Sequence, residues 1–156
     1  MSVDELAEYG MERMDDDDID AFLSTQRTGV LGLPTETNPY LLPLTFGYDD
    51  GESRLLFTFV LGATSRKRDL TERAEQATFL VYSVDSMFVW ESVMLSGSIS
   101  ELPESDWKTA MDALSDAWRP EIFEEADLSG GVAIYQFVIE DRSGIKYASL
   151  PPRFDL

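Results

Sequence analysis

The chain of 156 residues carries 30 acidic and 12 basic side chains, which gives a formal net charge of -18 at pH 7. This length favours one domain with a single core, spanning residues 1–156, and the sequence contains no Cys and no His. These absences exclude disulfides, thiol nucleophiles, Ser–His triads and His-based acid–base catalysis. They also exclude haem held by an axial His or Cys and zinc sites built on these residues.

The acidic excess also indicates which partners the protein avoids. A strongly negative surface repels nucleic acid and anionic lipid, and no apolar run is long enough to span a membrane. The first residues are acidic and lack the positive and then apolar layout of a signal peptide. We therefore expect a cytoplasmic protein that binds neither nucleic acid nor membrane.

Lysine is scarce, with Lys67, Lys108 and Lys146 as the three examples in the chain. Together with the acidic excess, this makes the composition similar to that of salt-in halophiles, and an archaeal source is expected. Molar salt screens charge repulsion beyond a few ångströms, so such a chain tolerates its own charge in a high-salt cytoplasm. A mesophilic acidic protein is the alternative, and the salt dependence of stability distinguishes the two.

The first clear helix is predicted over residues 17–25, where Ile19, Phe22 and Leu23 share one helical face. The segment before it, within residues 1–16, is either a short helix over residues 3–13 or a loose arm. The run Asp15-Asp16-Asp17-Asp18 suits the cap and first turn of the helix. A Mg²⁺ or Ca²⁺ site is the alternative for these carboxylates, but consecutive side chains cannot all face one ion, and we predict no metal.

The next elements are strands over residues 28–33, 40–48 and 54–61. Pro43 lacks an N–H donor, so its strand lies at a sheet edge or is bulged there. Asp49-Asp50-Gly51 is a strong hairpin signal between the second and third strands. A helix is predicted over residues 65–75.

The second half begins with strands over residues 78–84 and 88–102, and Gly97 in the second of them indicates a bulge or a sharp bend at a barrel corner. A helix over residues 104–118 follows, with Trp107, Met111, Leu114 and Trp118 at helical spacing. A strand over residues 132–140, a turn at 141–144 and a strand over 145–150 complete the domain.

This order predicts a mainly β (α+β) fold in which six or seven antiparallel strands form a barrel with flanking helices. Strands and helices do not alternate regularly, and the chain lacks a Gly-rich dinucleotide fingerprint, so a doubly wound parallel sheet is not expected.

Arg66, Lys67 and Arg68 stand together at the start of the helix predicted after the third strand, with Thr64 or Ser65 placed to cap it. A helix N-terminus offers free N–H groups and the positive end of the helix dipole, which suit a phosphate or carboxylate. Adjacent basic side chains add charge-assisted hydrogen bonds. We interpret the cluster as the phosphate site of a cofactor, and a solvated helix face is the alternative.

The sequence around this cluster resembles the pyridoxamine 5'-phosphate oxidase-like family of FMN-binding split barrels, in a haloarchaeal type. In that family, a strand ending in an aromatic residue and Thr or Ser leads into a Ser-Arg-Lys turn and a helix containing Leu. The matching residues here are Phe57, Thr58, Ser65, Arg66, Lys67 and Leu70. Further similarity lies in residues 43–51, 77–82 and 93–99, and the resemblance covers about residues 20–150.

The resemblance implies a homodimeric split barrel with FMN at the dimer interface. It places Arg66, Lys67 and Ser65 at the phosphate, and Thr58 at either the phosphate or the ring. It places Leu44, Thr45 and Phe46 against the ring, through main-chain groups and an aromatic wall. Ser92 aligns with a family Gln that contacts the flavin, although Ser is shorter.

The implied activity is that of an FMN-dependent oxidoreductase with a small-molecule substrate and a reductant such as NAD(P)H. The absence of His argues against the pyridoxal-forming reaction itself, and no residue is predicted to be catalytic. The alternatives are a deazaflavin-binding reductase and a non-enzymatic flavin-binding or regulatory module. A deazaflavin tail would need an extended basic groove, whereas the chain offers few basic residues beyond residues 66–68.

Overall fold

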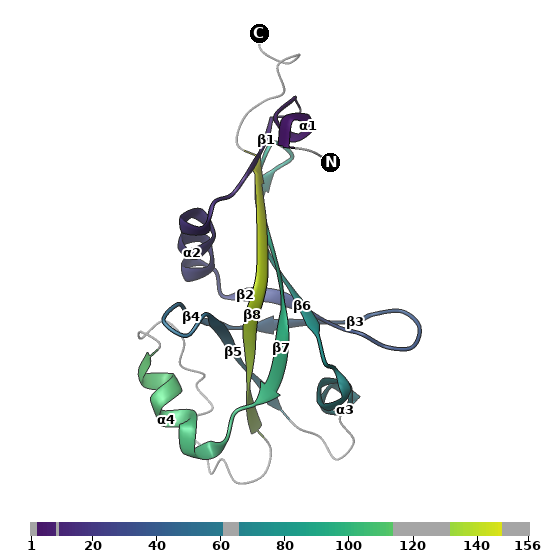
Figure 1. The fold of residues 1–156 in the computed structure, drawn as a ribbon, viewed down its shortest axis with the longest axis vertical. Coiled ribbons are helices and arrows are strands. Elements are labelled where there is room, and N and C mark those ends of the chain that lie inside the picture. Colours follow the sequence, from purple (N-terminus) through teal and green to yellow (C-terminus); the bar gives the residue numbers. More distant parts are fainter. Residues whose placement is uncertain (1–2, 9, 61–65, 114–131, 148–156) are drawn as a thin grey trace.

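A curled antiparallel sheet forms the body of the protein, and helices lie along its sides and ends (Figure 1). The computed structural model describes residues 3–8, 10–60, 66–113 and 132–147. The helices in these residues are α1 (Val3–Glu8), α2 (Asp16–Thr25), α3 (Arg66–Arg73) and α4 (Glu104–Ala113). Among the helices described, none combines the length and apolarity that crossing a membrane requires.

The strands follow one another by antiparallel pairing, in the order β3-β2-β6-β7-β8-β5-β4, and β1 adds to β8 off this path. Their bounds are β1 (Met11–Arg13), β2 (Thr28–Leu33), β3 (Tyr40–Thr45), β4 (Gly47–Asp49), β5 (Arg54–Val60), β6 (Ala77–Ser86), β7 (Val89–Glu101) and β8 (Val132–Tyr147). The prediction of a mainly β, antiparallel split barrel with flanking helices is confirmed. The short strand β1 was not predicted, and α1 agrees with the helical alternative for the N-terminal segment.

The aspartate run caps α2, as predicted. The backbone N–H of Asp18 donates to the Asp15 carboxylate at 2.8 Å, and the backbone N–H of Asp15 donates to the Asp18 carboxylate at 3.3 Å. This reciprocal pair satisfies two donors that a helix start leaves open. Ile19, Phe22 and Leu23 form the buried face of the helix, so the predicted amphipathic pattern is also confirmed.

Gly97 lies at a bulge, which confirms the prediction of an irregularity there. The β7–β8 register changes between Ser96, which faces Asp141, and Gly97, which faces Ile139, so that Glu140 is the extra residue. A Cβ atom at position 97 would lie 1.9 Å from the carbonyl oxygen of Val138. The two backbones can therefore approach as closely as they do because residue 97 has no side chain.

The predicted turn at residues 141–144 is wrong, because β8 continues without a break through all four positions. Asp141 pairs with Ser96 and Gly144 with Val93, within the same ladder. Gly144 has a packing role instead: a Cβ atom there would lie 2.8 Å from the Met14 sulfur, just before α2 begins. Residues 145–147 of the predicted last strand belong to β8, and residues 148–150 lie outside the described part.

The predicted strand over residues 40–48 is divided at Phe46 into β3 and β4. These consecutive strands stand at the two ends of the sheet path, so the short connection between them draws the two edges toward each other. The N–H of Phe46 donates to the carbonyl of Arg27 at 2.8 Å and holds the connection against the start of β2. Because β3 is an edge strand, Pro43 leaves no gap in an interior ladder, as predicted.

The main core fills the curl of the sheet and is rich in phenylalanine. The Phe79 ring lies 5.5 Å from that of Phe46, 6.1 Å from Phe57 and 6.0 Å from Phe137, measured between centroids. Such offset and edge-on contacts add to the stability that burial of the rings supplies. A second, smaller cluster lies under α4 and contains Leu56, Leu102, Ala110, Ile134 and Trp107.

The helices predicted after the third and fifth strands are present, and α3 ends two residues earlier than predicted. α3 covers residues 66–73 of the predicted 65–75, and α4 covers residues 104–113 of the predicted 104–118. The indole N–H of Trp107 donates to the carbonyl of Leu102 at 2.9 Å, which ties α4 to the end of β7. Positions 114–118 and the side chain of Met111 lie outside the described part.

Candidate functional site

Buried side chains of α3 fix the position of the start of this helix. Leu70 and Ala74 pack against the main core, and the side chain of Thr71 is only 2% exposed. With this face buried, Arg66 stands exposed at the first position of the helix. Ser65 lies outside the described residues, and Lys67 lies in α3 with its side chain outside them.

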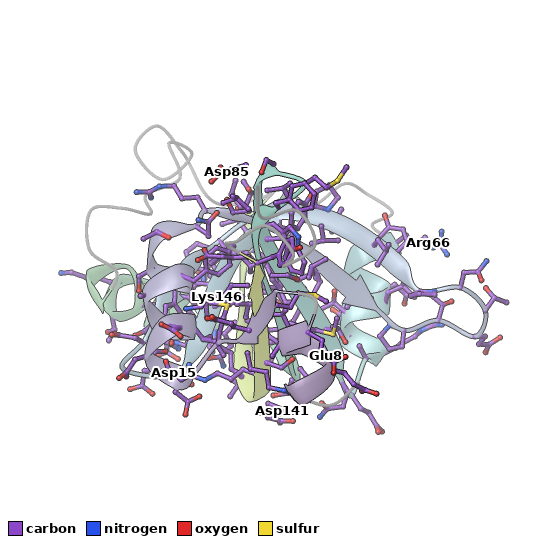
Figure 2. All side chains as sticks on the ribbon, turned by 90° about the horizontal axis from the view of Figure 1, so that it is seen from above. Glu8, Asp15, Arg66, Asp85, Asp141 and Lys146 are labelled. Atoms are coloured by element: carbon purple, nitrogen blue, oxygen red, sulfur yellow. The ribbon has the colours of Figure 1, made fainter. Side chains whose placement is uncertain are left out.

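The guanidinium of Arg66 lies over the ring of Tyr40, the first residue of β3, at 4.9 Å from the ring centroid. This distance is typical of a cation–π contact. Figure 2 shows Arg66 on the opposite side of the molecule from Asp15 and the acidic start of α2. The first turn of α3 thus combines the positive end of a helix with a basic side chain, in a chain whose charge is otherwise strongly negative.

Thr58 is half-buried in β5 and pairs with Ile134 of β8. Side chains alternate between the two faces of a strand, so Thr58 shares the face of Leu56, and Phe57 points into the main core between them. This is the face on which the small cluster under α4 lies. Seven residues lie between Thr58 and Arg66, and five of them, residues 61–65, lie outside the described part.

The three residues predicted to face a flavin ring occupy two different faces of the sheet. Leu44 is half-buried against the main core, and Phe46 is 1% exposed within it. Thr45 lies on the other face, is exposed, and pairs with Thr28. The Phe46 ring therefore belongs to the interior rather than to an exposed aromatic wall.

Ser92 lies on the same outer face as Thr45. It pairs with Tyr82 of β6 on one side and with Ile145 of β8 on the other. Continuing the β2–β6 register by two residues beyond Val30 and Leu80 brings Thr28 opposite Tyr82. Thr45, Thr28, Tyr82 and Ser92 thus form one row across four neighbouring strands, which we call the transverse row. Three strand spacings of about 4.8 Å separate its ends by roughly 14 Å.

The predicted residues do not form one compact site: Arg66 stands apart from Thr45 and Ser92, Thr58 lies on the face under α4, and Leu44 and Phe46 belong to the core side. Arg66 lies beside Tyr40 at the start of β3, whereas Thr45 lies at the end of the same strand, five residues and roughly 17 Å away at 3.4 Å per residue. Thr45 and Ser92 share the transverse row. An arrangement of this kind suits an elongated ligand with a charged end and a flat end.

Arg142 has a structural role on the α2 side of the sheet. Its guanidinium donates to the Asp20 carboxylate at 2.6 Å and to Asp16 at 3.1 Å, and the Tyr48 hydroxyl donates to the same Asp20 oxygen at 2.6 Å. The bonds from Arg142 and then Tyr48 lower the pKa of Asp20. Burial, followed by the bond to Asp20, raises the pKa of Tyr48 to about 12. This network joins α2 to β8 and β4.

A groove of about 260 Å³ lies beside α2 and is lined by residues that include Met14, Phe22, Glu91 and Lys146. Lys146 approaches Asp18 at 3.5 Å and Glu12 at 4.0 Å. Glu91 and Lys146 pair on the sheet face opposite to that of Ser92. The groove thus lies away from the transverse row, and its single ammonium is already offset by carboxylates.

Three residues beside Arg66 or in the transverse row were not predicted from sequence: Tyr40, Thr28 and Tyr82. Tyr40 follows Asn38-Pro39 at the start of a strand, and no spacing rule links it to Arg66, which is 26 positions away. Tyr82, whose side chain is 53% exposed, lies in the transverse row. Its place on the outer face follows from the alternation of β6, where Phe79 and Val81 are buried and Leu80 and Tyr82 are less so.

The strand order and the closure at Phe46 define the chain as an antiparallel split barrel. The family model described as pyridoxamine 5'-phosphate oxidase matches residues 15–146. The protein belongs to this family. The match includes α2, the sheet from β2 to β8 and α3, and so contains the predicted site residues.

Solved structures of the same fold include flavin-binding proteins. A FAD-binding protein from Mesorhizobium loti is 20% identical, with a TM-score of 0.70 over 89% of this chain and 98% of that one. A FAD- and heme-binding protein from Mycobacterium smegmatis is 18% identical, with a TM-score of 0.70 over 89% and 75% of the two chains. A FAD-binding protein from the same organism is 13% identical, with a TM-score of 0.67 over 88% and 98%.

Among curated proteins, no sequence matches this chain. The likeness to solved structures at these identities establishes the fold. This chain has no His and no Cys to serve as an axial heme ligand.

Proposed function

We propose that this protein is an FMN-binding oxidoreductase that holds the phosphate of its cofactor at the N-terminus of α3. The observation that carries the proposal is the exposed guanidinium of Arg66, stacked on Tyr40 at the first position of that helix. Membership in the pyridoxamine 5'-phosphate oxidase family and the flavin-binding neighbours support the same class of ligand.

The residues present suit a flavin nucleotide in their donor chemistry. A phosphate accepts hydrogen bonds from helix N–H groups and from basic side chains, and we assign it to Arg66, Lys67 and Ser65, with Thr58 at the phosphate or the ring. We assign the ring to the main chain of residues 44–46 and to Thr45 and Ser92. The bound flavin would supply hydride or electron transfer, and the protein would supply binding and orientation.

The distribution of positive charge favours FMN over a longer cofactor. FAD or a deazaflavin with a charged tail extends well beyond one phosphate and would need further basic residues along its path. Arg54, Arg142 and Lys146 already pair with carboxylates. Release of the chromophore by denaturation, followed by mass spectrometry, identifies the cofactor: a product of FMN mass is expected, and FAD or a deazaflavin would contradict this part of the proposal.

A homodimer with the cofactor at its interface is part of the proposal. The outer face of the sheet carries large apolar side chains with high exposed fractions: Leu41 64%, Val84 62%, Tyr82 53% and Met94 52%. Such a patch on a soluble protein marks an interaction surface. A Val84→Asp variant is expected to shift the mass measured by light scattering from dimer to monomer and to lose flavin, and a wild-type monomer that retains flavin would contradict it.

The phosphate assignment is tested by the flavin content of purified variants. Arg66→Ala combined with Lys67→Ala is expected to remove most bound flavin, because charge-assisted hydrogen bonds to an anion are lost. Arg73→Ala is the matched control, since Arg73 lies at the other end of the same helix and pairs with Asp69 at 3.4 Å. Unchanged flavin content in the double variant would overturn the assignment.

Turnover is tested separately from binding. The oxidoreductase proposal expects the flavin absorbance of the loaded protein to bleach when NADH or NADPH is added without oxygen. Tight flavin binding without reduction by either nucleotide would favour the alternative of a flavin-binding or regulatory module, because a fold does not determine turnover.

We also propose a halophilic, archaeal setting with a cytoplasm of high salt. The excess of 30 acidic over 12 basic residues supports it, and Asp15, Asp16 and Asp17 stand exposed side by side at the start of α2. The melting temperature is expected to rise steeply between dilute buffer and molar salt, because screening removes repulsion among these carboxylates. Full stability in dilute buffer would contradict this setting.

A further inference from the structure

Tyr40 and Arg66 connect a sheet edge with the start of a helix. Tyr40 begins β3 and pairs with Leu33, which is fully buried. Its ring is half-buried and packs against the main core. Arg66 lies over the ring at 4.9 Å from its centroid. The ring therefore has a position set by the core and carries the guanidinium on its surface.

The contact of Arg66 with an aromatic ring differs from the ion pairs that other cations form in the described part of the chain. Several of these pair with carboxylates at 4.0 Å or less: Arg54 with Asp49, Arg73 with Asp69, Arg142 with Asp16 and Asp20, and Lys146 with Glu12 and Asp18. A carboxylate partner neutralises the cation and occupies its N–H donors. The aromatic partner of Arg66 does neither.

The geometry of a guanidinium makes this difference useful for binding an anion. Its five N–H donors point outward in the plane of the group, around its edge. A cation–π contact uses the face of the group, so the edge stays available to a second partner. The ring also restrains a long side chain that would otherwise lose more conformational entropy when it binds.

We propose that Tyr40 is a positioning residue for phosphate recognition: its ring holds the Arg66 guanidinium at the start of α3 with its N–H edge open to the phosphate of a flavin nucleotide. The inference rests on the proposed function, because it assigns Tyr40 a role at the same site. Tyr40 acts through Arg66 and makes no contact of its own with the phosphate.

The test compares FMN with riboflavin, which has the same ring and lacks the phosphate. Dissociation constants for both are measured by quenching of flavin fluorescence. Tyr40→Leu is expected to weaken FMN binding roughly two- to fivefold, the amount that an exposed cation–π contact contributes, and to leave riboflavin binding unchanged. Tyr40→Phe keeps the ring and is expected to retain the FMN affinity of the wild type.

Two further variants separate positioning from a general effect on the fold. In the Arg66→Ala background, Tyr40→Leu is expected to have no additional effect on FMN, because its effect passes through Arg66. Tyr48→Leu is the matched control: Tyr48 is also half-buried against the main core, but its hydroxyl bonds to Asp20 on the α2 side. It is expected to leave the ratio of FMN to riboflavin affinity unchanged.

The outcomes distinguish the two proposals. Equal weakening of FMN and riboflavin by Tyr40→Leu, or the same loss with and without Arg66, would overturn the role of Tyr40 while the flavin site stands. A wild-type protein that binds neither FMN nor riboflavin would overturn the proposed function and the role of Tyr40 with it.

Discussion

The two sides of the barrel that carry α2 and α3 use arginine in opposite ways (Figure 1). On the α2 side, Arg142 is surrounded by acceptors and holds a helix against the sheet through Asp16 and Asp20. On the α3 side, Arg66 begins the helix and rests on an aromatic ring. The donors of Arg142 are engaged by carboxylates inside the fold, whereas the guanidinium of Arg66 is exposed and lies over a ring.

The proposed phosphate site depends on this difference, because the protein has a net charge of -18. Carboxylates are abundant, so a basic residue near the surface readily pairs with one and is neutralised. An aromatic partner restrains the cation without neutralising it. The comparison predicts that changes on the α2 side reduce stability, whereas the change on the α3 side reduces ligand binding.

The largest effect is expected from Gly144→Val, which adds a side chain under the start of α2. A Cβ atom there would lie 2.8 Å from the Met14 sulfur and 3.2 Å from Ile19 Cγ1. Overpacking of this kind costs about 3 kcal/mol in the free energy of unfolding, as measured by urea denaturation. A loss of less than about 1 kcal/mol would mean that α2 can move away from β8 with little penalty.

The second-largest loss of stability is expected from Arg142→Leu, which leaves Asp16 and Asp20 without their cation. Hydrogen bonds to charged groups contribute about 2 kcal/mol, and the side chain of Arg142 is only 21% exposed. The free energy of unfolding should fall by about that amount. Arg73→Leu, which removes an exposed pair on α3, is the control and should cost under about 0.5 kcal/mol.

A smaller effect, with a distinctive pH profile, is expected from Tyr48→Phe. Removal of the hydroxyl that bonds Asp20 costs about 1 kcal/mol near neutral pH. The pKa of Tyr48 is raised from 10.0 to about 12, so its contribution is complete below pH 10 and is lost as the pH rises through 12. The pKa of Asp20 is lowered, so the contribution of that carboxylate is present above its ordinary value of 3.8 and is lost as the pH falls through the lower, folded value.

Urea denaturation of wild type and Tyr48→Phe at pH 8 and at pH 11 measures this profile. The difference in stability between the two proteins should shrink at the higher pH. A difference that stays constant would show that the hydroxyl does not titrate with a raised pKa.

The smallest effect on stability is expected from Arg66→Ala. Its side chain is exposed, so the free energy of unfolding should change by less than about 0.5 kcal/mol. The affinity for FMN should nevertheless fall about tenfold or more, as expected for the loss of a charge-assisted hydrogen bond. A variant that is destabilised as strongly as Arg142→Leu would remove the contrast between the two sides of the barrel.

Much of the fold was predictable because it depends on local chemistry. The Asp15 cap, the hairpin at Asp49, the edge position of Pro43 and the bulge at Gly97 each follow from the requirements of one residue type. The turn predicted at residues 141–144 failed because of tertiary pairing. Residues 141–144 have the composition of a turn, but the long partner strand β7 keeps them extended, and Gly144 serves the close approach of the segment leading into α2.

The site was predictable in part for a similar reason. The basic cluster at residues 66–68 is visible in the sequence, and its place at a helix start was predicted. The buried position of Phe46 was not predicted. Alternation along one expected strand cannot show that the chain crosses there from one edge of the sheet to the other. Tyr40 was missed because its partner is distant in sequence.

The sequence by itself determined the antiparallel class, the Asp15 cap, the hairpin after Asp49, the basic start of α3 and the chemistry that the absence of His and Cys excludes. The tertiary structure decided which strands are neighbours, which face each side chain occupies, and which partner each arginine receives. Local preferences depend on residues a few positions apart. By contrast, the stacking of Arg66 on Tyr40 and the pairing of Arg142 with Asp20 depend on how a closed sheet brings distant segments together.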